Sequence, residues 1–179
     1  AAARVRPAGG AISLAEHASS SDFPRYAESV LPLGADVEGI FSARPGRFIQ
    51  NVTQIPDFAV SGALAREMWA RERGGEQVDG VIAIDPVALS YLLGATGPVT
   101  LPTGDVLTAE NAVPLLLNEV YFRYEDPADQ DAFFAAAAAS VFSALTAGGT
   151  DPAALVDALT RAGDERRLLL WSAREDEQA

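Results

Sequence analysis

The chain has 179 residues and a formal net charge of −12, with 13 basic against 25 acidic residues. Apolar residues make up 49% of it and charged residues 21%, which is typical of a globular domain with a core and not of a disordered chain. The excess of acid argues against nucleic acid and against an anionic membrane surface as partners, because both need a clustered basic face. The chain has no cysteine, which excludes disulfides and thiolate ligands, and a single histidine is too few for a typical zinc site.

The first third of the chain carries short signals. Residues 11–17 alternate between apolar and polar positions, which predicts a strand. Residues 25–31 predict a short helix that ends before a proline and a glycine. Residues 37–41 and 47–53 are expected to be extended, on either side of the turn at residues 44–46.

The remainder of the chain is more orderly. Residues 79–85 form an apolar run, which predicts a strand that is covered on both faces. Residues 99–107 predict a tight hairpin around Pro102-Thr103-Gly104-Asp105, and residues 166–172 predict a final buried strand. The predicted helices span residues 57–73, 86–93, 108–121, 128–145 and 152–162, and Pro114 is expected to kink the third or to mark its first turn.

Alternation of strands and helices, with the apolar strands far apart in sequence, predicts an α/β fold. We expect a three-layer αβα arrangement with a mixed sheet. No internal repeat and no linker divides residues 1–179, so one domain is expected. The chain opens without methionine and ends in a polar tail, and we expect it to be excised from a longer protein.

Four aspartates stand where predicted helices begin: Asp57, Asp85, Asp126 and Asp151. An aspartate in that place usually caps the helix, because its carboxylate accepts backbone N–H groups of the first turn, worth about 0.5–2 kcal/mol. The alternative role is that of a metal ligand or general base. That role requires two or three of these carboxylates to converge in space.

Two further residues are candidates for binding. Arg123 lies between two tyrosines and just before Asp126, and a structural role would be cation–π packing or a salt bridge to Glu125 or Asp126. The functional role would be a guanidinium fork for phosphate or carboxylate. Asn51, in a polar turn before the helix that Asp57 begins, is expected to be structural or to line a pocket.

Several blocks resemble an uncharacterised family of envelope-associated proteins of high-GC bacteria, known only as domain of unknown function four-zero-one-two. They are residues 51–58, 78–86, 121–127, 130–134 and 168–172. The resemblance covers about residues 51–172. It implies a membrane-anchored protein whose domain lies outside the cytoplasm, and it implies no known activity.

The order of elements is also distantly similar to that of the LytR-CpsA-Psr proteins, which attach glycopolymers to the cell wall from lipid pyrophosphate carriers. Residues 78–99 followed by 111–123 carry this likeness, and Arg123 matches one of the arginines that hold the pyrophosphate in those enzymes. The long helix at residues 128–145 contains no arginine or lysine here, although related enzymes carry several arginines on it. A desolvated pyrophosphate needs compensating positive charge, so this departure argues against the transferase reaction.

Two hypotheses follow. The first is an extracytoplasmic cell-envelope domain with a binding or assembly role, without robust catalysis and without a cofactor, whose partner is an envelope polymer or a lipid-linked precursor. The alternative is a divergent phosphotransferase that acts on a lipid-pyrophosphate-linked glycopolymer, with carboxylates holding a divalent ion such as Mg²⁺. Under either hypothesis the membrane is reached only through a segment absent from this chain. The candidate ligand-binding residues are Asn51, Asp57, Asp85, Arg123 and Asp126.

Overall fold

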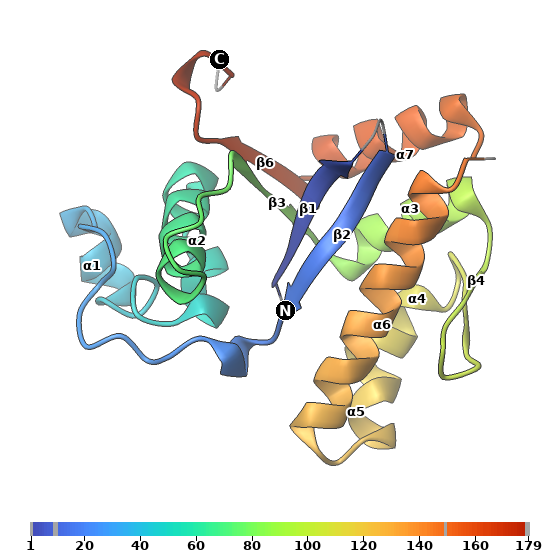
Figure 1. Ribbon diagram of the computed structural model, residues 1–179, viewed down its shortest axis with the longest axis horizontal. Coiled ribbons are helices and arrows are strands. Elements are labelled where there is room, and N and C mark those ends of the chain that lie inside the picture. The colour runs from blue at the N-terminus through green and yellow to red at the C-terminus, as the bar shows by residue number, and fades with distance from the viewer. Residues whose placement is uncertain (1, 9–10, 149, 178–179) are drawn as a thin grey trace. The chain divides into compact units, whose positions relative to one another are not determined.

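The computed structural model describes residues 2–8, 11–148 and 150–177 (Figure 1). The chain is a mixed α/β protein and 54% of it is helical, so the predicted α/β class is confirmed. The chain divides into two compact units, each described here by itself. Unit 1 comprises Ala1–His17 and Ile84–Leu168, and unit 2 comprises Ala18–Ala83 and Leu169–Ala179. The expectation of one domain stays a prediction.

The strands form small two-stranded sheets in the described part of the chain, in place of the one mixed sheet that the sequence predicts. The pairs are β1 (Ala2–Ala8) with β2 (Ala11–Ala18), β3 (Gly80–Ile84) with β6 (Leu168–Ser172), and β4 (Val99–Thr100) with β5 (Val106–Leu107). The β4–β5 pair is the predicted hairpin, antiparallel with Val99 opposite Leu107. The three-layer arrangement is not confirmed.

The α-helices of the described residues are α1 (Ala35–Phe41), α2 (Phe58–Glu72), α3 (Pro86–Thr96), α4 (Ala112–Pro114), α5 (Val120–Arg123), α6 (Pro127–Thr146) and α7 (Pro152–Asp164). From Asp57 onward they follow the predicted order. Short 3₁₀ turns lie at η1 (Ser20–Asp22), η2 (Ile49–Gln54) and η4 (Glu175–Glu177), and a π-helical turn, η3 (Leu115–Glu119), joins α4 to α5.

Three predictions for the N-terminal third are wrong. Residues 25–31 are not helical, because their backbone donors bond to another segment: the N–H of Tyr26 donates to the carbonyl of Arg47 at 3.2 Å and that of Val30 to Gly46 at 2.9 Å. The stretch at 37–41 belongs to helix α1, whose first turn holds acidic residues that favour a helix N-terminus. Most of residues 47–53 lies in the 3₁₀ turn η2 and not in a strand.

The expected burial of β3 and β6 is also wrong. Ile82 is 61% exposed, Ile84 48% and Leu170 66%. Each of these strands pairs only with the other among the described residues, so neither is the central strand of a wide sheet whose two faces are both covered. An apolar run alone therefore does not distinguish a central strand from one in a two-stranded ribbon.

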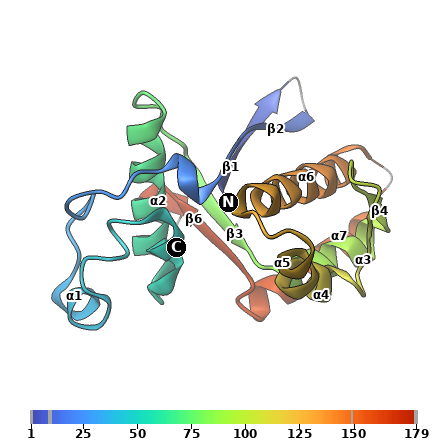
Figure 2. The same ribbon diagram turned by 90° about the horizontal axis from the view of Figure 1, so that it is seen from below.

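The core of unit 1 lies between α3, α6, the β4–β5 hairpin and the segment from α4 to α5, which Figure 2 shows from below. Its largest side chain is Phe133, which is 2% exposed. The π-helical turn matters here because it places Leu115 and Val120, five residues apart, in the same core. Pro114 lies in the first turn of this segment, in α4 and directly before η3, which agrees with the alternative that it marks the first turn of the predicted helix.

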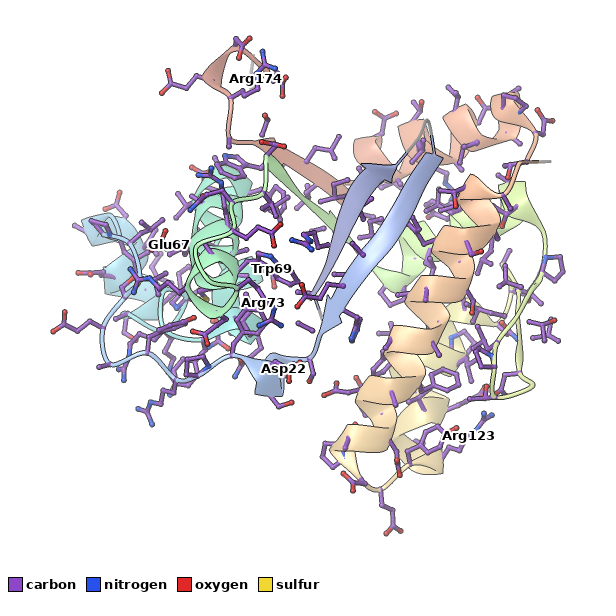
Figure 3. The ribbon with its side chains drawn as sticks, viewed as in Figure 1. Asp22, Glu67, Trp69, Arg73, Arg123 and Arg174 are labelled. Carbon is purple, nitrogen blue, oxygen red and sulfur yellow. The ribbon has the colours of Figure 1, made fainter. Side chains whose placement is uncertain are left out.

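The core of unit 2 forms around α2. Leu64 and Met68 are fully buried on it, and Trp69 packs against Phe23 with ring centroids 6.3 Å apart. The guanidinium of Arg73, one turn further along α2, lies 5.0 Å from the Trp69 ring centroid (Figure 3). Helix α2 also packs against the turn η2, which brings residues of the candidate site into this unit.

Two helical glycines make a matched test of packing in the two units. In α2, a Cβ at Gly62 would lie 2.8 Å from Cγ of Trp171, whereas a Cβ at Gly94 in α3 would meet nothing within 4 Å. We expect Gly62→Ala to destabilise the protein by about 1–3 kcal/mol through overpacking. We expect Gly94→Ala to stabilise it by about 0.5–1 kcal/mol, because alanine favours helix. Urea unfolding of both variants measures the difference, and equal effects would contradict the described packing of α2 against β6.

Candidate anion-binding site

A pocket of about 360 Å³ lies in unit 2, between the segment that follows η1 and the loop that connects α1 to η2. Its lining residues are Arg25, Ser42, Arg44, Arg47, Phe48, Gln50 and Asn51. Three of the chain's 13 basic residues therefore line one pocket, and no aspartate or glutamate is among the lining residues. In a chain with a net charge of −12, this is a local concentration of positive charge.

The pocket is built by pairing between two loops. The backbone N–H of Tyr26 donates to the carbonyl of Arg47 at 3.2 Å, and Nε of Arg47 donates back to the carbonyl of Tyr26 at 2.8 Å. Gly46 allows this close approach, because a Cβ at that position would overlap Ser29. Without a side chain at residue 46 the two loops meet, and Arg25 comes to the same pocket as Arg47.

Helix α2 anchors the same loops. The Tyr26 hydroxyl donates to Glu72 at 3.0 Å, and NH2 of Arg71 donates to the carbonyl of Val30 at 2.9 Å. Burial, followed by the hydrogen bond to the Glu72 carboxylate, raises the pKa of Tyr26 well above its usual range. Tyr26 therefore stays a neutral donor at all ordinary pH values and holds the loop to the helix.

The three arginines of the pocket differ in how firmly they are held. Arg47 is half-buried and bonded to the Tyr26 carbonyl, and its guanidinium lies 6.0 Å from the Phe48 ring centroid. Arg25 is exposed and lies 5.3 Å from the same centroid. Arg44 is exposed, and its guanidinium forms no hydrogen bond or ion pair with any residue that the structure describes.

The other polar residues that line the pocket, Ser42, Gln50 and Asn51, are neutral. Asn51 is half-buried in η2, and its backbone N–H donates to the carbonyl of Phe48 at 3.0 Å. Ser42 has a φ of 54°, a conformation that is uncommon for residues other than glycine and that often occurs at ligand sites. Guanidinium forks beside amide and hydroxyl groups make an arrangement suited to an oxyanion.

Of the five residues that the sequence suggests for binding, the pocket brings in Asn51 alone. The aspartates cap helices, which is the role that the sequence favours for them. Asp57 accepts a hydrogen bond from the N–H of Ala59, Asp126 from that of Ala128 and Asp151 from that of Ala153, each at 2.9 Å. Asp85 accepts from the N–H groups of Val87 and Ala88 at 2.9 and 2.8 Å. Their carboxylates lie at the starts of four different helices.

Arg123 has a partner that the sequence does not suggest. Its NH1 donates to Oδ1 of Asp105 in the hairpin at 2.7 Å, and not to Glu125 or Asp126 (Figure 3 labels Arg123). Asp105 also accepts a bond from the Thr103 hydroxyl at 2.7 Å, and these two bonds, that of Thr103 first, lower the pKa of its carboxyl. The guanidinium of Arg123 thus tethers the β4–β5 turn to the end of α5.

A second charged cluster lies in unit 1, where α7 ends beside the start of α3. Glu165 accepts from the Tyr91 hydroxyl at 2.7 Å and from Nε of Arg161 and Arg167 at 3.0 and 3.1 Å, and Arg167 also donates to Asp85 at 2.9 Å. Arg161 stacks on the Tyr91 ring, 3.9 Å from its centroid. Each of its charges faces an opposite one, so the cluster fastens α7 to α3.

Arg25, Arg44 and Arg47 are not among the residues that the sequence suggests for binding. One signal was present: Arg44 and Arg47 flank Pro45-Gly46, and a tight turn brings the residues on its two sides close together. Arg25 lies 19 residues before Arg44, and only the backbone pairing of Tyr26 with Arg47 places it there.

Substitution of the pocket arginines distinguishes an arginine that stabilises the fold from one that is available to a ligand. We expect Arg47→Gln to destabilise the protein by about 1–2 kcal/mol, because it removes a charge-assisted bond to a backbone carbonyl. We expect Arg44→Gln to change the free energy of unfolding by less than about 0.5 kcal/mol, because the Arg44 side chain is exposed and makes no such bond. Chemical denaturation of the two variants tests this. A large loss of stability in Arg44→Gln would mean that Arg44 has a structural role.

The Glu165 cluster predicts a dependence of stability on pH. The bond from Tyr91, then that from Arg161, lowers the pKa of Glu165 below its usual value of 4.5. Its stabilising contribution is therefore present above about pH 4.5 and lost as the pH falls. We expect Glu165→Gln to be less stable than the wild type at pH 7, and the difference to shrink between about pH 5 and pH 3. Glu175→Gln, a change at an exposed glutamate, is the control in thermal unfolding. A difference that stays constant with pH would contradict this role.

The described residues contain no group of three or more histidines and carboxylates placed to hold a metal ion. In the same part of the chain, no helix combines the length and apolar character needed to cross a membrane.

A family model described as "Protein of unknown function (DUF4012)" matches residues 1–121. The match includes every residue of the pocket and ends before Arg123. It overlaps the resemblance quoted above over residues 51–121 and extends it to the start of the chain. Searches of curated proteins and of solved structures find no match. Because the model covers more than half of the chain, the protein belongs to this family of unknown function, DUF4012.

Proposed function

We propose that this protein is a binding domain of the bacterial cell envelope, outside the cytoplasm, that holds an anionic envelope polymer or lipid-linked precursor in the pocket of unit 2. The observation that carries the proposal is the lining of that pocket: three arginines, two amide side chains and no acidic residue. Arginine is suited to this task, because its planar fork donates two parallel bonds to a carboxylate or phosphate group.

The composition of the pocket favours binding over catalysis. Its one nucleophile is the hydroxyl of Ser42, and no histidine, carboxylate or lysine lines the pocket to accept the proton of that hydroxyl. Nucleophilic catalysis by serine needs such a base within hydrogen-bond reach. A site of this kind would hold its ligand and leave it unchanged.

The envelope location rests on the resemblance of the sequence blocks and on the order of elements. Helix α2, strand β3, helix α3, the β4–β5 hairpin, the α4–α5 segment and the long helix α6 follow one another along the chain. This is the order that the sequence resemblance to the LytR-CpsA-Psr proteins implies. We infer from this order a distant relationship to the fold of those proteins. A membrane anchor in the full-length protein would then keep the domain at the envelope.

The transferase alternative has less support. It requires Arg123 to bind the phosphates together with carboxylates that hold a metal ion. The Arg123 guanidinium is bonded to Asp105 at 2.7 Å, and the carboxylates of Asp57, Asp85 and Asp126 accept backbone bonds at the starts of three different helices. Among the described residues, no group of three or more histidines and carboxylates is placed to hold a metal ion.

Polyanion binding tests the proposal. We expect the chain to bind polygalacturonate and dextran sulfate in calorimetry, and to show no affinity for neutral dextran of similar length. Binding should weaken as salt rises from about 50 to 300 mM, because the Debye length falls and the charges are screened. The loss of one charge-assisted contact in Arg44→Gln should reduce affinity roughly tenfold.

Arg174→Gln is the matched control, since it removes the same charge from an exposed arginine outside the pocket (Figure 3). Its affinity should equal that of the wild type. Equal binding of neutral and anionic polymers, or equal losses in the two variants, would refute the pocket as the binding site.

A further inference from the structure

We infer that the pocket prefers a phosphoryl group with two negative charges, such as a phosphate monoester on a sugar or polyol, to a single carboxylate or phosphodiester. This inference rests on the proposed function, because it assigns the class of anion that the same pocket prefers. It follows from the number of charges and of free donors that the lining presents.

The charge of the pocket calls for more than one negative charge on the ligand. Three guanidiniums line it and no acidic side chain does, so the lining is formally +3. A carboxylate or a phosphodiester brings one negative charge and leaves most of this uncompensated. A phosphate monoester carries about −1.5 to −2 at neutral pH, because its second pKa is near 6.

The donors agree with a tetrahedral group. Nε of Arg47 is taken by the Tyr26 carbonyl, so its two terminal nitrogens remain for a ligand. Arg44 has all its donors free of partners among the described residues, and Arg25 faces the Phe48 ring. A monoester presents three oxygens in three directions, one for each guanidinium, whereas a carboxylate presents two oxygens in one plane.

The rest of the ligand stays in contact with solvent. Arg25, Arg44 and Gln50 are exposed, and the face of Phe48 is approached by two guanidiniums at 5.3 and 6.0 Å. A sugar ring that stacked on Phe48 would therefore have to compete with these two guanidiniums. Selectivity then resides in the phosphoryl group, with the amides of Gln50 and Asn51 left to bond to hydroxyl or ester oxygens.

Three small probes test the inference on the full chain. Glucose 6-phosphate supplies a dianion, glucuronate a carboxylate on a similar ring, and dimethyl phosphate a diester. We expect glucose 6-phosphate to bind at least tenfold more tightly than either of the others in calorimetry at pH 7.5. Arg44→Gln should lose about tenfold in affinity for it, and Arg174→Gln should lose none.

The pH dependence separates the ligands further. Between pH 7.5 and pH 5.5 the phosphate monoester loses most of its second charge, because its second pKa is near 6. Affinity for glucose 6-phosphate should fall about fourfold from pH 7.5 to pH 5.5, because the fraction of the ligand that carries the second charge falls by that factor. Affinity for glucuronate should stay constant, since its carboxylate remains ionised.

The outcomes distinguish this inference from the proposed function. If glucuronate binds as tightly as glucose 6-phosphate, and both depend on Arg44, the preference for a dianion is overturned and the anion-binding function stands. If polyanions and all three probes fail to bind, the proposed function fails as well. If glucose 6-phosphate binds equally to the wild type and to Arg44→Gln, the assigned site is overturned.

Discussion

The capping of helices by aspartate is the interaction on which most of this structure depends. The four longest helices each begin after an aspartate whose carboxylate accepts backbone N–H groups, and proline follows in three of them. These N–H groups have no partner inside the helix, and a negative charge also opposes the positive end of the helix dipole. The acidic residues that look most reactive in the sequence are therefore committed to starting helices.

That commitment explains how much could be predicted. The helices that begin at Asp57, Asp85 and Asp126 were predictable, because the capping residue and the apolar positions of each helix lie close together in the sequence. The β4–β5 hairpin was predictable for the same reason. Local signals fail where a segment bonds to a distant one, and Tyr26 with Arg47 is the example: the chain around Tyr26 resembles a helix but pairs with a loop 21 residues away.

The candidate site lies where local signals fail. Asn51 was suggested by its place in a polar turn, whereas the arginines that give the pocket its character were not, because their proximity depends on Gly46 and on the loop pairing. Arg123 shows the converse. Its neighbours in sequence are acidic, yet its partner Asp105 lies 18 residues away across the hairpin turn. Contacts of this kind cannot be read from spacing.

A strongly acidic protein can hold an anion when its charges are arranged locally. Screening over about 8 Å at physiological salt means that the net charge of −12 matters less to a bound group than the charges that touch it. The overall charge still repels polyanions at a distance and slows their approach. The arrangement therefore favours a ligand presented at high local concentration.

Arg44 has no bonding partner among the residues that the structure describes, and this has a consequence for the family. Gly46 and Arg47 hold the loop together, so selection for folding alone would retain them in every member that keeps this loop. The Arg44 guanidinium makes no such bond with any residue that the structure describes, so the fold alone does not require an arginine there. If the proposed function is correct, family members that bind the same ligand are expected to keep an arginine at this position, and members that keep Gly46 but not Arg44 are expected to bind it more weakly.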